Sequence, residues 1–388
     1  MADEQVMAAL TRTGVSRRAF LKYCATLSSL LALPGTTAAE LVARLQAARR
    51  QPVIWLSCQE CTGCTESLTR SAAPALENLL FDFISLDYHH TLMAAAGTAA
   101  ESAREQTLKQ SHGQFLLVVD GSVPARPGYC TIAGNDNLAL LRDCLQGAAA
   151  VIAIGSCAVF GGLPAATPNP SGALGVAALM QRGLVPERPL VNLPGCPPIP
   201  MVISGLLAHY LAFDRFPELD DQRRPLVFYG ATVHQRCSRF HFYHEKKFAE
   251  RFDDEGARKG WCLYKLGCRG PDTANACSTL KWNDATSSPI DAGHPCIGCS
   301  EPGFWDRGGF YRQPETSGAQ QTSDSGRTFY LDNCKKCHGP DPGELHSSPE
   351  GVSEVLRSGK VRAHSKLAAG EEQLQQLESW LRSLDAKK

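Results

Sequence analysis

Sixteen cysteines in a chain of 388 residues constrain the fold more than any other feature of the sequence. Cysteines at this density form either a disulfide framework or a set of metal sites. Disulfide frameworks are typical of short chains with little core of their own, and this chain is long. Its cysteines also stand in Cys-x-x-Cys pairs, near histidines and near Gly-Pro turns. The sequence therefore predicts several metal sites.

The N-terminal segment has the features of an export signal. Residues 16–22 contain the pair Arg17-Arg18, residues 23–34 form a modest apolar stretch, and small residues follow. Because that stretch is too short to span a bilayer, we interpret residues 1–39 as a twin-arginine signal peptide, with an amphipathic N-terminal helix as the alternative. No other segment approaches 18 continuous apolar residues. We therefore expect a periplasmic protein without a membrane anchor of its own.

Five short apolar runs bounded by turns indicate strands in the next part of the chain. They are residues 53–56, 81–86, 115–119, 151–154 and 190–193, and stretches with helical spacing, such as 75–80 and 138–145, lie between them. Strands that alternate with helices predict a parallel sheet covered on both faces. We expect a flavodoxin-like, doubly wound α/β domain over residues 50–215, preceded by a polar connector at residues 40–50.

The composition changes after residue 215. Residues 216–310 are rich in Gly, Pro, aromatic residues and Cys, and we expect an irregular domain that metal clusters hold together. Residues 311–325 resemble a linker, and residues 326–388 a small all-α domain. Its last helix, predicted over 371–384, has apolar residues at helical spacing, namely Leu374, Leu377, Trp380, Leu381 and Leu384. The formal net charge of zero gives no indication of a nucleic-acid partner.

Loops after the predicted strands carry cysteines that should meet at one edge of the sheet, because ligands bind outside the carboxyl ends of parallel strands. We predict an iron–sulfur cluster held there by Cys61, Cys64, Cys130 and Cys196. Cys157 also follows a strand, but we interpret it as a small buried apolar residue. Cys58, on the strand before the first loop, and Cys144, on a helix face, are expected not to bind metal.

Two further ligand sets lie in the irregular domain. His234, Cys237, Cys262 and Cys268 suit either zinc or a [4Fe–4S] cluster, and Cys277, Cys296 and Cys299 suit a [3Fe–4S] cluster. The fourth position of the first set could instead fall to His294 or Asp291, although we expect His294 to shape the loop before Pro295. A pair of structural zinc sites is the alternative for the whole region. A row of redox clusters has a purpose in electron transfer that a row of zinc ions lacks.

The last domain contains a haem attachment motif. Residues 334–338 read Cys-Lys-Lys-Cys-His, so Cys334 and Cys337 would bond a c-type haem and His338 would bind its iron. The layout resembles a small class I cytochrome c. Such domains usually have a methionine before the last helix as the sixth ligand, and this chain has none after Met201.

Histidines must therefore be considered for the sixth position. His364 stands where the methionine is normally found, before the closing helix, and we predict bis-histidine ligation by His338 and His364. His346 or an open position are the alternatives. A second histidine in place of methionine should lower the reduction potential of the haem.

With these motifs in view, residues 52–305 resemble the small subunits of [NiFe] hydrogenases. The resemblance is carried, in order, by CTGCTE at 61–66, DGSVP at 120–124, PGCPP at 194–198, HxxC at 234–237, WCLYKLGC at 261–268 and HPCIGC at 294–299. It implies a proximal and a distal [4Fe–4S] cluster and a medial [3Fe–4S] cluster on the three ligand sets above. The nickel–iron centre of the family belongs to the large subunit. This chain is thus expected to bind that subunit and relay electrons from dihydrogen oxidation, with no catalytic residues of its own.

Two departures from the family are informative. Oxygen-tolerant members carry extra cysteines around the proximal cluster, whereas Gly63 and Asn135 stand at those positions here. Membrane-bound members end in an apolar helix that meets a cytochrome b, and here a haem domain takes its place. We expect the haem to pass electrons to an external carrier such as a periplasmic cytochrome. Rival interpretations are a dihydrogen-sensing small subunit, a quinone-reductase subunit and an electron carrier of another oxidoreductase.

The axial ligand gives a first test. Replacing His364 by Met should raise the reduction potential of the haem, because an axial methionine raises it relative to histidine. A potentiometric titration of the visible bands of the haem measures the shift, and His346→Met is the matched control. An unchanged potential in His364→Met would contradict ligation by His364.

Overall fold

The computed structural model describes residues 25, 38–71, 83–306, 329–331, 333–334, 338, 348–358 and 370–385. The chain separates into two compact units, Met1–Tyr311 and Arg312–Lys388. Most of the predicted signal peptide and the whole predicted linker at residues 311–325 lie outside the described residues.

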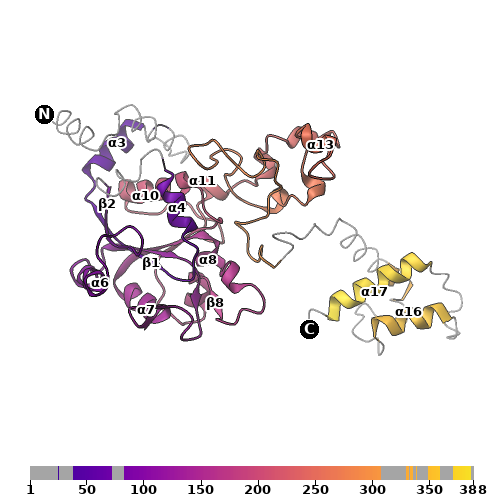
Figure 1. Ribbon diagram of the computed structural model, residues 1–388, viewed down its shortest axis with the longest axis horizontal. Coiled ribbons are helices and arrows are strands. Elements are labelled where there is room, and N and C mark those ends of the chain that lie inside the picture. Colours follow the sequence, from indigo (N-terminus) through magenta and orange to yellow (C-terminus); the bar gives the residue numbers. More distant parts are fainter. Residues whose placement is uncertain are drawn as a thin grey trace. The chain divides into compact units, whose positions relative to one another are not determined.

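A parallel sheet of five strands is the centre of the first unit (Figure 1). The strands are β1 (Gln51–Ser57), β2 (Ile84–Tyr88), β3 (Phe115–Asp120), β7 (Ala148–Ile154) and β9 (Leu190–Leu193). They lie in the order β2-β1-β3-β7-β9, and every neighbouring pair is parallel. Counted along the chain this is the 2-1-3-4-5 order of flavodoxin-like sheets, which open a ligand crevice between their first and third strands. The predicted parallel α/β sheet and its five strands are confirmed.

Helices cover both faces of the sheet. They are α4 (Gly63–Thr69), α6 (Thr98–Gln110), α7 (Asn137–Gly147), α8 (Gly155–Phe160), α9 (Val176–Gln181) and α10 (Pro200–Phe213). Two short antiparallel pairs, β4 (Val123–Pro124) with β8 (Ala173–Leu174) and β5 (Thr131–Ile132) with β6 (Asn135–Asp136), lie in the connecting loops. Figure 1 shows α4 and α10 on one side of the sheet and α6 and α7 on the other.

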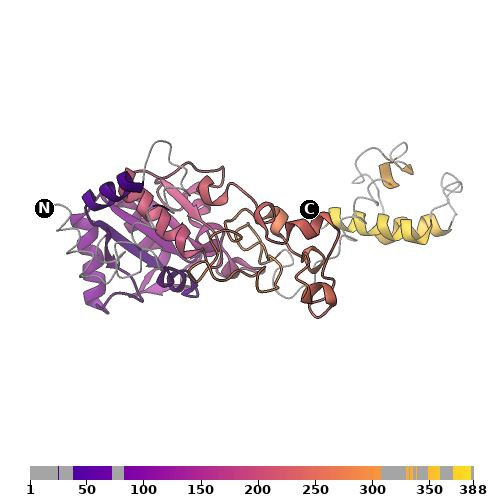
Figure 2. The same cartoon turned by 90° about the horizontal axis from the view of Figure 1, so that it is seen from above.

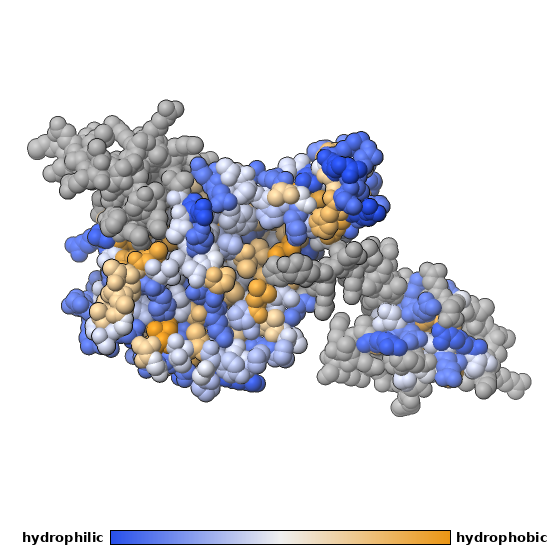
Figure 3. Space-filling view, viewed as in Figure 1, coloured by the Kyte–Doolittle hydropathy of each residue, from blue (hydrophilic) through white to orange (hydrophobic). Residues whose placement is uncertain are grey.

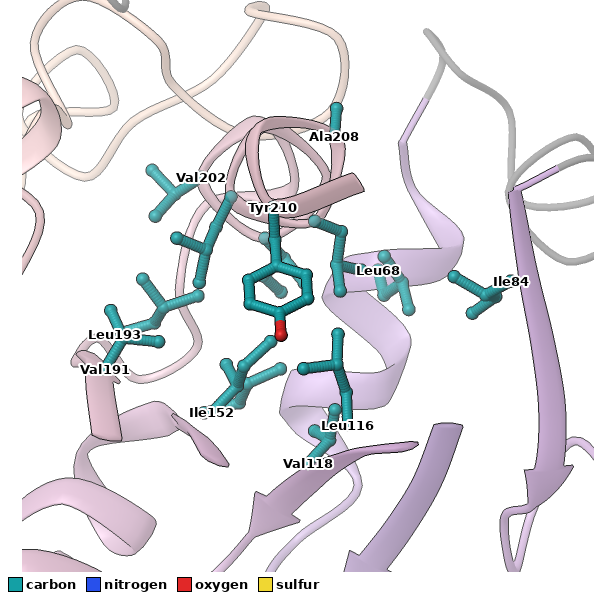
Figure 4. Close-up of a cluster of buried hydrophobic side chains, with 14 of the residues drawn as sticks. Leu68, Ile84, Leu116, Val118, Ile152, Val191, Leu193, Val202, Ala208 and Tyr210 are labelled. Carbon is teal, nitrogen blue, oxygen red and sulfur yellow. The ribbon is translucent and has the colours of Figure 1, made fainter. Parts of the chain in front are cut away.

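Alternate residues of each strand point to opposite faces, and both faces are buried. Val53, Leu116 and Ile152 pack with residues of α4 and α10 in one core cluster. Figure 4 shows this layer, with Tyr210 of α10 among strand residues and Leu68 of α4. The next residues along the strands join a second cluster with α7 and α9. The continuous apolar runs of the sequence follow from this burial on two faces.

The segment that precedes β1 differs from the predicted polar connector. Residues Ala38–Ala47 form helix α3, which contacts α10. Leu41 and Leu45 are fully or almost fully buried in the same core cluster as β1. Figure 2 shows α3, in indigo, beside α10 from above. The prediction was wrong because the segment has only three apolar residues larger than Ala, which are too few to show a helical period in the sequence.

Beyond α10 the first unit becomes irregular. Between α10 and residue 306 the helices are all short: α11 (Leu226–Tyr229), η3 (His234–Arg236), α12 (Phe240–His244), α13 (Glu255–Arg258), η4 (Tyr264–Leu266) and η5 (Gly270–Asp272). Another short helix, η2 (Leu163–Ala165), lies in the loop after α8. Phe228, Tyr229 and Ala276 join the core of the sheet. A small separate cluster forms around Val233 and Leu263, and four cysteines pack at its edge. The irregular segment is therefore continuous with the α/β part within one compact unit.

The second unit contains two described helices, α16 (Pro349–Ser358) and α17 (Glu371–Asp385), which contact each other. The predicted apolar face of α17 is confirmed, since Leu374, Leu377, Trp380 and Leu381 are buried. Tyr330 and the partly buried Cys334 pack against this cluster. Within the described part of the chain, no helix has both the length and the apolar character that crossing a membrane requires.

The packing of α3 gives a stability prediction. Leu41→Ala should lower the free energy of unfolding of the first unit by about 2–5 kcal/mol, because the Leu41 side chain is fully buried and its truncation leaves a cavity. Arg49, exposed just beyond α3, is the control, and Arg49→Ala should change that free energy by less than about 0.5 kcal/mol. Denaturant unfolding followed by tryptophan fluorescence measures both, since Trp55 lies in the same cluster. Equal stability of Leu41→Ala and the wild type would contradict a structural role for α3.

Candidate functional site

Four cysteine thiols gather at the carboxyl edge of the sheet. Cys61 and Cys64 follow β1, Cys157 follows β7 at the start of α8, and Cys196 follows β9. Burial raises the pKa of Cys64 well above its usual value, and Asp120, Cys157 and Cys196 raise it further. Burial likewise raises the pKa of Cys157 to about 12, with Cys196 and Cys61 as neighbouring thiols. These four side chains therefore face one another across three loops.

Glycines lie against the sulfur atoms of this group, so no side chain fills the space beside them. A Cβ atom on Gly155 would come within 2.5 Å of the Cys64 Sγ, and one on Gly162 would collide with the Cys157 Sγ. Gly63 also lies against the Cys61 Sγ, with its would-be Cβ at 3.2 Å. Four thiols in such a cradle fit an iron–sulfur cluster, because metal replaces the proton on a buried thiol that would otherwise stay protonated.

Cys130, the fourth ligand expected from the sequence, has different neighbours. Burial raises the pKa of its thiol, and Glu60 is the charged group that raises it further. Its thiol also faces Cys58, whose raised pKa results from burial first and then in part from Cys130. The carbonyl of Cys130 accepts a hydrogen bond of 3.1 Å from the Asn137 N–H at the start of α7. Cys130 thus stands with Cys58 near this group, and Cys157 completes the group in its place.

A signal for Cys157 was present in the sequence. Gly155-Ser156-Cys157 follows its strand directly, as Gly195-Cys196 follows the next strand. Cys130 instead comes ten residues after β3, beyond the β4 strand and a turn. Cys144 is fully buried among leucines of α7, as expected.

The second predicted ligand set lines one cavity. His234, Cys237, Cys262 and Cys268 surround it together with Gly270, Pro271 and Ile290. A Cβ on Gly270 would lie 3.3 Å from the Cys268 Sγ, so this site too is bounded by a glycine. Burial, and then the charge of His244, lowers the pKa of His234, which favours the neutral imidazole that binds metal. The donor set and the cavity fit a metal cluster.

The third predicted set also comes together. Burial raises the pKa of Cys277 well above its usual value, and Cys299 and Cys296 are the thiols that raise it further. Both alternative ligands are engaged by other partners. Asp291 pairs with Lys281 at 2.9 Å and accepts a hydrogen bond from Ser288 at 2.8 Å. His294 Nδ1 lies 2.9 Å from the Pro295 carbonyl and its ring stacks on Phe252, which agrees with a loop-shaping role.

The three thiol groups adjoin one another in a row. The Cys299 thiol of the third group neighbours Cys196 of the first, whose backbone N–H lowers the pKa of Cys299 and whose thiol raises it. The Cys268 thiol of the second group neighbours Cys296 of the third, whose thiol raises the pKa of Cys268 and whose backbone N–H lowers it. Ser156, beside Cys157, donates a hydrogen bond to the Cys299 carbonyl and accepts one of 3.0 Å from Gly195. No three His, Cys, Asp or Glu side chains of the described residues come close enough together to hold a single metal ion.

The haem motif is only partly described. The Cys334 carbonyl accepts a hydrogen bond of 3.0 Å from the His338 N–H, and the Cys334 N–H donates one of 2.8 Å to the Tyr330 carbonyl. Cys337, His346 and His364 lie outside the described residues.

A parallel α/β sheet with a row of adjoining cysteine groups defines an iron–sulfur electron-transfer protein. Residues 229–312 match the C-terminal family of NiFe/NiFeSe hydrogenase small subunits, and residues 61–210 match the 20 Kd subunit of NADH ubiquinone oxidoreductase. The uptake hydrogenase small subunit of Azotobacter vinelandii is 45% identical over 309 residues, covering 79% of this chain and 85% of the relative. The hydrogenase-1 small chain of Escherichia coli K12 is 43% identical over 311 residues, covering 80% and 82%.

Solved structures agree with these relatives. A [NiFeSe]-hydrogenase chain of Desulfomicrobium baculatum matches with a TM-score of 0.63 at 34% identity, covering 69% of this chain and 99% of that chain. An actinobacterial-type NiFe-hydrogenase from Ralstonia eutropha H16 matches at 23% identity and a TM-score of 0.62, covering 80% and 92%, and so supports the fold alone. The chain belongs to the family of NiFe hydrogenase small subunits. It is an iron–sulfur subunit of an oxidoreductase, and it pairs with a hydrogenase large subunit.

Whether Cys157 or Cys130 is the fourth ligand of the first group can be tested directly. Cys157→Ser should lower the iron content of the purified complex, because it removes one of four adjoining thiols. Cys130→Ser, a matched thiol at the same edge, should leave the iron content unchanged. Colorimetric iron analysis per chain distinguishes the two, and the reverse pattern would restore Cys130 as the ligand.

Proposed function

We propose that this chain relays single electrons from a hydrogenase large subunit through three iron–sulfur clusters to a fused c-type haem. The observation that supports this best is the row of adjoining cysteine groups, linked by Cys196 with Cys299 and by Cys296 with Cys268. Electron transfer needs redox sites in close succession. Structural zinc sites would have no need of such an order.

The proposed proximal cluster is held by Cys61, Cys64, Cys157 and Cys196. The medial [3Fe–4S] cluster is held by Cys277, Cys296 and Cys299, and the distal [4Fe–4S] cluster by His234, Cys237, Cys262 and Cys268. When bound, these clusters supply sites that accept and release one electron each. If Cys157 is the ligand, the residue five positions after it is Gly162. Like Asn135, this residue is not a cysteine. The inference that the extra cysteines of oxygen-tolerant members are absent is therefore unchanged.

The protein supplies rigid positions for these sites. Ser156 connects the loop of Cys157 with the carbonyl of Cys299. Tyr229, fully buried, donates a hydrogen bond of 2.8 Å to the Pro194 carbonyl and lies beside Cys277 and Cys299. Arg224 pairs with Asp220 at 2.8 Å and with Glu301 at 3.0 Å, which fixes the loop after Cys299. Fixed ligand loops keep the distances between the sites constant.

The face near the proximal group suits a protein partner. Tyr129 and Leu163, which are 51% and 47% exposed, lie in the loops after β3 and α8 that surround this group. Figure 3 shows apolar residues on the surface of the first unit. Exposed aromatic and aliphatic side chains next to a redox site are expected where the large subunit binds and delivers electrons.

The distal group suits the exit of electrons. The His234 ring touches Phe240 at 4.9 Å and Tyr243 at 4.7 Å between ring centroids, and Phe240 and Tyr264 are 37% and 45% exposed. The haem of residues 334–338 is the proposed next site, with His364 as its second axial ligand. Fusion keeps this acceptor at high effective concentration. We further propose a periplasmic location reached through the twin-arginine signal, and an external carrier as the final acceptor.

A quinone-reductase subunit is the second candidate, since residues 61–210 match a subunit of NADH ubiquinone oxidoreductase. The second and third cysteine groups after residue 229 count against it. They lie within the segment that matches hydrogenase small subunits.

The proposal is tested on the complex purified without air. Added dihydrogen should reduce the haem, seen in its visible bands, within the turnover time of the enzyme. His338→Leu is the matched control, which should abolish these bands and leave dihydrogen-dependent reduction of an artificial dye intact. Dye reduction with a haem that stays oxidised would exclude the haem as exit. Loss of both, without a large subunit in the preparation, would overturn the relay itself.

A further inference from the structure

One arginine lies between the second and third cysteine groups. Arg269 follows Cys268 directly, and its backbone N–H donates a hydrogen bond of 2.8 Å to the Cys296 carbonyl. Its side chain reaches across the loop of residues 296–299. A Cβ atom on Gly298 would lie 3.1 Å from the guanidinium carbon and 3.2 Å from Nε. The guanidinium therefore rests flat on the glycine between Cys296 and Cys299.

The missing side chain at this position makes the contact possible. Gly298 has a φ of 77°, in the left-handed region that favours glycine, and any side chain there would push the guanidinium away. The bound conformation of Arg269 is thus built into the Cys-Ile-Gly-Cys loop.

The guanidinium has an N–H group without an acceptor. Its Nη1 atom is buried and has no hydrogen-bond partner in the described structure. A buried donor of a charged group is costly to leave unpaired. Asn275 Nδ2 and Trp282 Nε1, which flank Cys277 in the sequence, are buried donors without partners as well. The Arg269 donor, which lies against the loop of residues 296–299, indicates an acceptor that the polypeptide does not provide.

The charge of Arg269 acts on the third group. Burial raises the pKa of the Cys296 thiol, while the Gly298 N–H, the Thr273 hydroxyl and the charge of Arg269 oppose the rise. Glu301, the carboxylate near this thiol, is engaged by Arg224 and by the Ala274 N–H at 2.8 Å. Its charge is therefore balanced mainly by Arg224.

We propose that Arg269 is a positioning residue that donates its buried N–H to the medial cluster and raises the reduction potential of that cluster. This inference rests on the proposed function, because it takes the medial group as a cluster site. Reduction adds one electron and one negative charge, and a nearby cation stabilises the more negative state. Hydrogen bonds to the cluster sulfurs act in the same direction.

The test is a redox titration of the purified complex, with the paramagnetic signal of the oxidised medial cluster as readout. Arg269→Gln should lower the midpoint potential. At the wild-type midpoint the ratio of oxidised to reduced cluster should rise about tenfold, which equals about 59 mV for one electron. Arg269→Lys, which keeps the charge, should shift the ratio much less. Arg142→Gln removes an exposed arginine whose Nε donates to the Leu184 carbonyl at 2.7 Å, and should titrate as the wild type.

A second measurement needs no variant to fold. Wild-type complex containing ¹⁵N-arginine should give a nitrogen coupling to the medial cluster signal in pulsed electron paramagnetic resonance. Absence of that coupling, or an Arg269→Gln potential equal to the wild type, would overturn the inference. Absence of any medial cluster signal in the wild type would instead overturn the proposed three-cluster relay.

Discussion

Burial of cysteine thiols is the constraint on which the rest of this structure depends. A buried thiol resists losing its proton, and here burial is the largest cause of the raised pKa of every thiol in the three groups that shows a shift. Metal binding displaces that proton, and the metal–sulfur bonds offset the free energy that deprotonating a buried thiol costs. The irregular segment has only a small apolar cluster of its own, so we expect bound metal at its cysteines to supply much of its stability.

The parallel sheet and the irregular segment contribute differently to the site. The sheet brings Cys61, Cys157 and Cys196 together because its strands end at one edge, and its two buried faces make that edge rigid. The irregular segment instead folds around its cysteines. Tyr229 joins the two parts, since it belongs to the core of the sheet and lies beside Cys277. A single compact unit thereby holds all three groups.

In the proposed relay, the order of the three groups gives the direction of electron flow. The first group lies among loops with exposed Tyr129 and Leu163, where a large subunit can cover it. The second lies under the half-exposed Phe240 and Tyr264, where electrons can leave. The third lies between them and is contacted by the one guanidinium that we assign to its potential. Local electrostatics can therefore adjust the middle of the path without altering either end.

The sequence by itself determined the local features of this protein. Alternating elements predicted the five parallel strands, helical spacing predicted the buried face of α17, and closely spaced motifs predicted which side chains gather in the second and third groups. These features depend on residues near one another in the chain. Tertiary structure placed Cys157 and not Cys130 beside Cys64, because both cysteines follow strands and only the meeting of distant loops brings one of the two thiols there. It also decided the role of α3. The two buried leucines of this helix stabilise the fold only through packing in the core with α10, which lies more than 150 residues later in the chain.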